Sequence, residues 1–311
     1  MTRILRSNPV THLAPMLALC GALGAEAATV STIQFNTARA SSLALGTIQD
    51  VKIGFFVAAP TASIARDALA PVDGTTFREQ AFVEVDASAI RARGSLSAVA
   101  GASAVSYLSQ VTAAVQDGFR IDSTLYDGQL ARVEYTLDVS GLLAPALDAG
   151  AGTLALAGSS WRVSSGCQSI LQCGQVVYTG SATQTGGVLT AAGDEVGLLS
   201  FVLDVRFGTV VNLLTTLDLT NQLLFGDLAT GVGAEGIAGT ASADFASTVT
   251  WSGIRRVALA DGTLVTDWTT TSGSSFDYGS ASVVPVPGAL WLMGSALAGL
   301  GALRAARRPS T

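Results

Sequence analysis

Cys167 and Cys173 are the residues whose types and spacing indicate the most definite chemistry. Five residues separate them, in a segment flanked by Gly166 and Gly174. A pair of cysteines in an exported chain favours a disulfide, and closing so short a loop contributes about 2–3 kcal/mol. A redox pair would normally have the tighter Cys-x-x-Cys spacing, and a metal site would need more ligands. We therefore predict a structural disulfide between Cys167 and Cys173.

The remaining polar residues give little support to catalysis. The single histidine, His12, lies in the first 27 residues, so the rest of the chain lacks Ser-His-Asp, Cys-His and His-Glu-x-x-His arrangements. Acids in or beside expected strands leave a glycosidase-type carboxylate pair open as a less favoured alternative. We interpret these acids as solvated strand faces and expect no catalytic residues. The acids concerned are Glu84, Asp86, Glu134, Asp138, Asp194, Glu195 and Asp204.

One glycine-rich segment matches a nucleotide-binding pattern. Residues Gly231–Gly236 read Gly-Val-Gly-Ala-Glu-Gly, which fits Gly-x-Gly-x-x-Gly. That function also requires a preceding buried strand and a following helix, and the chain contains 34 glycines, so a chance match is expected. We predict a loop there. Calcium binding at Asp-rich turns stays open, although no Asp-x-Asp-x-Asp-Gly loop occurs; we expect no cofactor and no metal site.

The aromatic residues allow two interpretations. They can form a platform on which sugar rings stack, or they can fill the core of a β-fold. Trp251 and Trp268 fall within expected strands, which favours the core. The full set is Trp161, Trp251, Trp268, Tyr107, Tyr126, Tyr135, Tyr178 and Tyr278.

The elements that would position these residues are strands. Apolar and polar residues alternate with period two in 82–86, 132–139, 199–207 and 247–252, which is the pattern of a sheet with one buried face. Short strands separated by turns predict an all-β body, an antiparallel β-sandwich of jelly-roll-like form. Turn dipeptides recur at Asp73-Gly74, Asp117-Gly118, Asp127-Gly128, Gly193-Asp194 and Asp261-Gly262.

Three parts of this body allow more than one reading. Residues 96–115 and 213–224 fit either a helix or a strand, because alanine, serine and leucine suit both. We expect one domain over 28–282, with a boundary near Gly150–Gly158 as the alternative. Near the end, we expect a hairpin with a strand to Ile254, a turn at Asp261-Gly262 and a return strand through Trp268.

The first 27 residues have the organisation of a secretory signal peptide. Arg3 and Arg6 form a basic region, and Met16–Gly24 is a short apolar core. Ala25 and Ala27 then place small residues at the positions that signal peptidase recognises. As a helix the apolar core would span about 13 Å, far less than a bilayer core of about 30 Å. We predict export and cleavage after Ala27.

Cys20 raises a lipoprotein alternative, but Leu19 precedes it where lipoprotein signals carry a small residue. Between the leader and the C-terminal tail, residues 28–284 contain 12 basic and 22 acidic residues, a net charge of −10. Nucleic-acid binding needs clustered cations that displace counterions. An acidic body therefore argues against nucleic acid and against adhesion to anionic membrane surfaces.

The C-terminus combines a proline motif, an apolar segment and arginines. The motif is Val284-Pro285-Val286-Pro287, and Gly288–Leu303 is uncharged and would span about 24 Å as a helix. Arginines retained on the cytoplasmic side would place the body outside, in agreement with the leader. We predict a single transmembrane helix within 283–311, with a plain unprocessed anchor as the alternative. The membrane-flanking basic cluster is Arg304, Arg307 and Arg308.

This three-part order closely resembles the PEP-CTERM sorting signal, in a variant in which Val286 occupies the position of the central glutamate. The resemblance implies processing by an exosortase, an integral-membrane protease, in bacteria that commonly make extracellular polysaccharide or biofilm. Residues 243–254 also resemble the last strands that often precede such tails.

We therefore expect an exported surface or extracellular-matrix protein with a structural or adhesive role that is not an enzyme. It would be anchored transiently in the inner membrane, with exopolysaccharide as a further candidate partner. The alternative is a carbohydrate-binding module.

Overall fold

Two antiparallel sheets make up the fold, as the alternating pattern predicts. The computed structural model describes residues 30–42, 46–57, 62–72, 75–86, 88–149, 154–167, 175–274 and 276–279. The described residues contain strands and turns but no helix. They belong to a compact unit that ends at Ala281.

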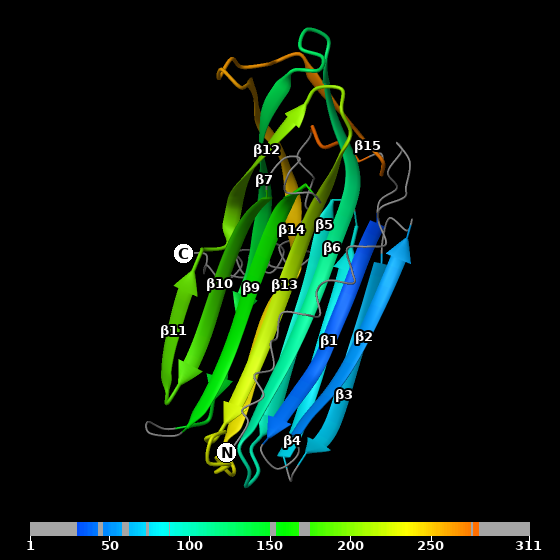
Figure 1. Ribbon diagram of the computed structural model, residues 1–311. Helices are drawn as coiled ribbons and strands as arrows, with labels where there is room; N and C mark the ends of the chain where they lie inside the picture. The colour runs from blue at the N-terminus through cyan, green and yellow to red at the C-terminus, as the bar shows by residue number, and fades with distance from the viewer. Residues whose placement is uncertain are drawn as a thin grey trace, which may run out of the picture. The chain divides into compact units, whose positions relative to one another are not determined.

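The first sheet has eight strands in the order β11-β10-β9-β13-β6-β1-β2, with β15 also paired to β6. Neighbours in this sheet are antiparallel, and in Figure 1 the sheet runs from β11 at one edge to β2 at the other. Its strands are β1 (Val30–Ser42), β2 (Gly46–Val57), β6 (Val105–Ser123), β9 (Ala155–Cys167), β10 (Gln175–Thr185), β11 (Val188–Gly193), β13 (Val211–Phe225) and β15 (Trp268–Ser272).

The second sheet has seven strands in the order β12-β7-β14-β5-β4-β3, with the two-residue β8 paired to β14. All of its pairings are antiparallel as well. Its strands are β3 (Ala62–Val72), β4 (Thr75–Val85), β5 (Ala89–Val99), β7 (Leu130–Leu143), β8 (Ala146–Leu147), β12 (Gly197–Arg206) and β14 (Ala238–Leu259).

The core lies between the two sheets because side chains of a strand point alternately to its two faces. In β6 and β13 of the first sheet and β7 and β12 of the second, buried residues alternate with half-buried or exposed ones over most of the strand. The larger cluster joins residues of both sheets, among them Val111 and Leu217 with Val133 and Phe201. The structure is therefore a β-sandwich.

A smaller cluster occupies another level of the same interior, and a polar layer lies between the two. Along β6, Ser109 lies between Tyr107 of the smaller cluster and Val111 of the larger one. Ser109 donates a hydrogen bond to the buried carboxylate of Glu79 in β4, across the sandwich. A shift of the strand register by two residues would leave each side chain on the same face of its sheet but would break the hydrogen bond between Ser109 and Glu79. The polar layer therefore fixes the register of the long strands.

The segments that allowed two readings are strands. Residues 96–99 belong to β5, 105–115 belong to β6 and 213–224 belong to β13. The region around Gly150–Gly158 contains no domain boundary among the described residues, because β9 pairs with β13 inside the first sheet.

One turn prediction is wrong, and one hairpin prediction is wrong in its return strand. Asp117-Gly118 lies inside β6, where both residues are buried, because the alternation of the strand continues through the dipeptide. The hairpin at Asp261-Gly262 is confined to the end of β14, where the amide of Leu259 donates to the carbonyl of Thr263. Beyond it the return segment crosses to the first sheet, since Trp268 of β15 pairs with Ser123 of β6.

The other predicted turns, the one at Asp261-Gly262 included, are as expected where they are described. Gly128, Gly193 and Gly262 have positive φ angles of 71°, 100° and 88°, which glycine adopts without strain. Asp73-Gly74 lies outside the described residues, as do the signal-cleavage residues, the sorting motif and the basic cluster. Among the residues that the structure describes, no helix is long and apolar enough to span a membrane.

Candidate functional site

The site that the structure singles out is the place where the end of the body is fastened to the core. Asp117 is 1% exposed in the middle of β6, between the inward-facing Val115 and Phe119. Its carboxylate accepts hydrogen bonds from the amide of Ser274, 3.1 Å away, from the Ser274 hydroxyl, and from the Tyr278 hydroxyl at 2.8 Å. A buried carboxylate is stable only with such donors, so β6 and residues 274–278 depend on each other. We call this arrangement the C-terminal junction.

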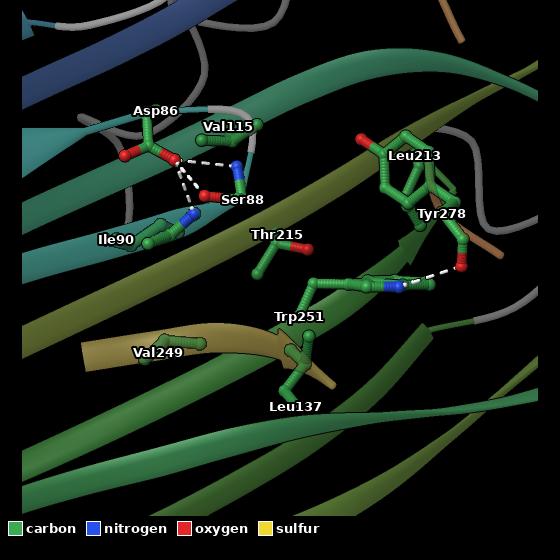
Figure 2. A pocket seen from close by; sticks show the side chains of 11 residues that line it. Asp86, Ser88, Ile90, Val115, Leu137, Leu213, Thr215, Val249, Trp251 and Tyr278 are labelled. Atoms are coloured by element: carbon green, nitrogen blue, oxygen red, sulfur yellow. Dashed lines mark hydrogen bonds between the residues drawn. The ribbon is translucent and has the colours of Figure 1, made fainter. Parts of the chain in front are cut away.

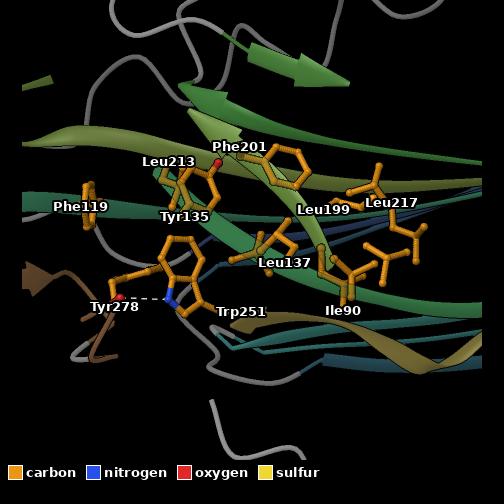
Figure 3. Packing of buried hydrophobic residues seen from close by; sticks show 14 of the residues in the cluster. Ile90, Phe119, Tyr135, Leu137, Leu199, Phe201, Leu213, Leu217, Trp251 and Tyr278 are labelled. Atoms are coloured by element: carbon orange, nitrogen blue, oxygen red, sulfur yellow. Dashed lines mark hydrogen bonds between the residues drawn. The ribbon is translucent and has the colours of Figure 1, made fainter. Parts of the chain in front are cut away.

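A stack of aromatic rings holds the other side of the junction. The indole Nε1 of Trp251 in β14 donates to the carbonyl of Tyr278 at 3.0 Å, and the two rings meet edge to face with centroids 4.8 Å apart. Trp251 also stacks on Tyr135 of β7 with centroids 4.6 Å apart, and Phe119 of β6 contacts Tyr278 at 5.3 Å. Figure 3 shows these side chains meeting between the sheets. Tyr278 is thus fixed by both sheets.

The electrostatics keep the hydroxyl groups of this cluster protonated. Burial raises the pKa of Tyr278 above its ordinary value, and the charge and hydrogen bond of Asp117 raise it further. Burial also raises the pKa of Tyr135, whose hydroxyl donates to Ser165 at 2.6 Å. Both phenols are therefore hydrogen-bond donors in the accessible pH range and serve as structural groups.

A small cavity lies beside the junction. It has a volume of about 30 Å³ and is bordered by Trp251, Tyr278, Leu213 and Thr215. Figure 2 shows these side chains, with the Asp86 turn at the other end of the cavity. A space of that size accommodates water and is far too small for a sugar ring. The junction is therefore an attachment point within the fold and offers no ligand pocket.

The acids Glu84 and Asp86, at the end of β4, have structural partners. Asp86 accepts hydrogen bonds from the amide of Ser88 at 2.7 Å and from the amide of Ala89 at 2.8 Å, which closes the turn between β4 and β5. Arg91 lies 3.5 Å from Glu84 and 3.8 Å from Asp86, so one guanidinium forms an ion pair with each acid. Each acid thus has a partner that accounts for its position.

The acids of β7 and β12 line a shallow hollow on the second sheet. The hollow has a volume of about 230 Å³ and spans β12, β7 and β14. Across it, Arg132 lies 3.0 Å from Asp204, and Arg256 is opposite Glu134 in the strand register. The hydrogen bond and charge of Asp204 raise the pKa of the exposed Arg132. Opposite charges alternate here as on a solvated strand face.

The other predicted acids lie apart from this hollow. Asp138 is half-buried in β7, and Glu195 is exposed in the turn that follows β11. Asp194 accepts a hydrogen bond from the amide of Thr179 at 2.8 Å, which attaches the end of β11 to β10.

Comparison with known proteins gives no assignment. No protein-family model matches the chain, and no curated protein matches it.

The aromatic residues belong mainly to the core. Trp161 and Trp251 are each 4% exposed, and Tyr107, Tyr135 and Tyr278 are buried as well. The partly exposed members, Trp268, Tyr126 and Tyr178, pack against the larger cluster. The core interpretation is thus confirmed for the buried rings, and the described aromatic residues provide no flat stacking platform.

The remaining motifs are placed as follows. Cys167 ends β9, is buried and is disulfide-bonded, whereas its expected partner Cys173 lies outside the described residues. Gly231–Gly236 forms turns that lead into β14, so the loop prediction is confirmed. The described residues contain no group of three or more His, Cys, Asp or Glu side chains that could hold a metal ion.

Sequence reasoning missed the junction, although a signal was present. Asp117 occupies an odd position in a run whose odd members Val111, Val115, Phe119 and Ile121 all point inward. An acid on the buried phase of a strand indicates a polar partner elsewhere in the chain. The turn rule for Asp-Gly concealed that signal.

Proposed function

We propose that this chain is an exported surface or extracellular-matrix protein with a structural or adhesive role, sorted through its PEP-CTERM-like tail. Residues 1–27 direct export, and residues 28–282 form a non-catalytic, jelly-roll-like sandwich outside the cytoplasm. Residues 283–311 hold the chain in the inner membrane until an exosortase-type protease processes the tail. The body then reaches the cell surface or the matrix.

The observation that carries this proposal is the way in which the body ends. Tyr278 is hydrogen-bonded to Asp117 and Trp251, and only five residues separate it from Val284, where the sorting motif begins. A connection that short keeps a folded domain close to the point of processing. Once the processed C-terminus is attached to the surface or the matrix, a pull on it would act directly on the long strands β6 and β14. Such a connection suits a displayed structural domain.

Variants of the tail test the sorting step. Replacing Arg304, Arg307 and Arg308 with Ala, or Pro285 and Pro287 with Ala, should leave the body folded and exported but should prevent its release from the membrane. The measurement is an immunoblot of membrane, surface and medium fractions. As a matched control, replacing Arg255 and Arg256 of the body with Ala should leave the distribution unchanged. Release of both tail variants at the normal level would contradict the proposal.

The outer face of the first sheet supports carbohydrate binding as a second candidate function. Polar side chains lie on the outer side of adjacent strands there: half-buried Thr216 of β13 is hydrogen-bonded to buried Ser164 of β9 at 2.6 Å, and half-buried Thr112 of β6 is bonded to Asp218 at 2.7 Å. Such a surface can recognise sugars through hydrogen bonds alone. Calorimetric titration with exopolysaccharide should then show saturable binding that Thr216→Lys abolishes, and absence of heat would exclude this function.

A further inference from the structure

The edge strand β11 differs from every other strand whose side chains the structure describes. All six of its residues are exposed, and Val188 and Leu189 are each 63% exposed although they are adjacent and point to opposite faces. In the described structure β11 pairs with β10 alone, so its outer backbone groups form an open sheet edge, visible at one side of the first sheet in Figure 1. An open edge is a template for another strand.

The other three sheet edges carry charged residues, which are a common protection against strand addition. Within their sequences, β2 contains Asp50 and Lys52, β3 contains Arg66 and Asp67, and β12 contains Asp204 and Arg206. In contrast, β11 reads Val-Leu-Thr-Ala-Ala-Gly and contains neither a charge nor a proline. Among the four strands that end the two sheets, β11 is thus the one without a charge, and the short β15, which in the described structure pairs with β6 alone, contains none either.

Charge also decides what can approach this edge. The chain has a net charge of −6, so two copies repel each other over most of their surfaces. From Val163 to Gly193, however, no residue is charged, and β10 and β11 both lie in that stretch. A second copy that approaches the β10–β11 hairpin therefore meets no like charge within the hairpin itself, although Asp194 and Glu195 follow directly after Gly193.

We infer that β11 pairs antiparallel with β11 of a second copy of this chain and joins the two first sheets into one. A two-fold axis at Thr190 places Thr190 opposite Thr190 of the second copy. Val188 and Leu189 then lie opposite the second copy's Ala192 and Ala191, so large side chains meet small ones on both faces. Threonine pairs are favourable across strands, and a large side chain opposite an alanine fits without a clash.

The pairing is weak between free molecules and strong in an array. A six-residue strand buries much less surface than the interfaces of stable dimers. Copies that are displayed side by side raise each other's effective concentration, so weak contacts accumulate. Homotypic pairing would thus supply the adhesive step of the proposed surface role, but the pairing itself does not depend on how the chain is sorted.

Cysteine cross-linking tests the register directly. In purified full-length protein, Thr190→Cys should form an intermolecular disulfide on mild oxidation, because opposite residues in an antiparallel pair bring their Cβ atoms to about 4.5–5.5 Å. Thr209→Cys, at an exposed position between β12 and β13, is the matched control and should cross-link at the background rate. Equal cross-linking of the two variants would overturn the inference.

A second pair of variants separates the edge from any association through the tail. Leu189→Lys should remove the dimer that sedimentation velocity detects at high protein concentration and should suppress cross-linking when combined with Thr190→Cys. Leu198→Lys changes a leucine that is 57% exposed on the charged edge strand β12. It should leave the dimer and the cross-linking unchanged. Circular dichroism verifies folding of each variant. Association that survives Leu189→Lys would refute pairing through β11 without bearing on the sorting proposal.

Discussion

The C-terminal junction and the β11 edge place polar groups in opposite situations. At the junction, Asp117 is buried and accepts bonds from Ser274 and Tyr278, so its polar groups are used within the chain. At the edge, β11 is fully exposed and one side of its backbone has no strand beside it in the described structure. In this fold the buried acid is used for attachment within the chain, whereas the uncharged edge is the place where we propose attachment to a second copy.

The largest expected effect comes from breaking the junction at Trp251. We expect Trp251→Ala to lower the free energy of unfolding by about 3–5 kcal/mol, because it removes a large buried ring and leaves a cavity between the sheets. Urea unfolding followed by circular dichroism measures the change. Trp268→Ala removes a ring that is only partly buried and should lower the free energy of unfolding clearly less than Trp251→Ala does. Equal losses in the two variants would contradict the special role of the junction.

A smaller effect is expected from the Tyr278 hydroxyl alone. Tyr278→Phe keeps the ring but removes a donor to the buried carboxylate of Asp117, which should cost about 1.5–3 kcal/mol. The matched control is Tyr178→Phe, which removes an exposed hydroxyl that donates to the carbonyl of Ser200 at 2.7 Å. That control should cost about 1 kcal/mol or less. A control as destabilising as Tyr278→Phe would show that burial is irrelevant here.

Asp218 is a half-buried acid that can be compared with buried Asp117 through the dependence of the free energy of unfolding on pH. Burial raises the pKa of Asp218, while the Thr112 hydrogen bond and the charge of Arg162 lower it in part. The folded state then binds a proton more readily than the unfolded state. The free energy of unfolding therefore falls as the pH rises from the ordinary pKa of aspartate through the raised pKa of Asp218. Asp218→Asn should therefore be slightly more stable than the natural chain at pH 7 and equally stable below the ordinary pKa of aspartate. Thermal unfolding at a series of pH values tests this sign, and a gap that widens on acidification would refute it.

The smallest effect on stability is expected at the edge. Leu189→Lys should change the free energy of unfolding by less than about 0.5 kcal/mol, because the side chain is exposed. Its consequence should be confined to association. A large loss of stability in the monomer would mean that β11 contributes to the core after all, and would remove the contrast between the two regions.

The sequence predicts the strands better than it predicts their partners. Alternation identifies β7 and β12 because most of their inward residues are large and apolar and most of their outward residues are polar. It leaves 96–115 open, because alanine and serine fit both periods. It also says nothing of pairing, so the position of β13 between β9 and β6 is visible only in the structure.

The candidate site was harder to foresee for the same physical reason. Asp117 meets Ser274 and Tyr278 through contacts between distant parts of the chain, and local turn statistics pointed the other way. The lack of charge in β11 is legible in the sequence, but its position at a sheet edge is not. Spacing alone likewise could not show that Arg91 forms ion pairs with both Glu84 and Asp86.

The most direct test of the central claim is intact mass spectrometry of the native protein recovered from the cell surface or the medium. The account predicts a chain that begins at Ala28 and has lost Arg304, Arg307 and Arg308 with the rest of the tail. Its mass should therefore be well below the 31.5 kDa of the full chain. Recovery of the full-length chain with both ends intact would contradict export, tail processing and the surface role together.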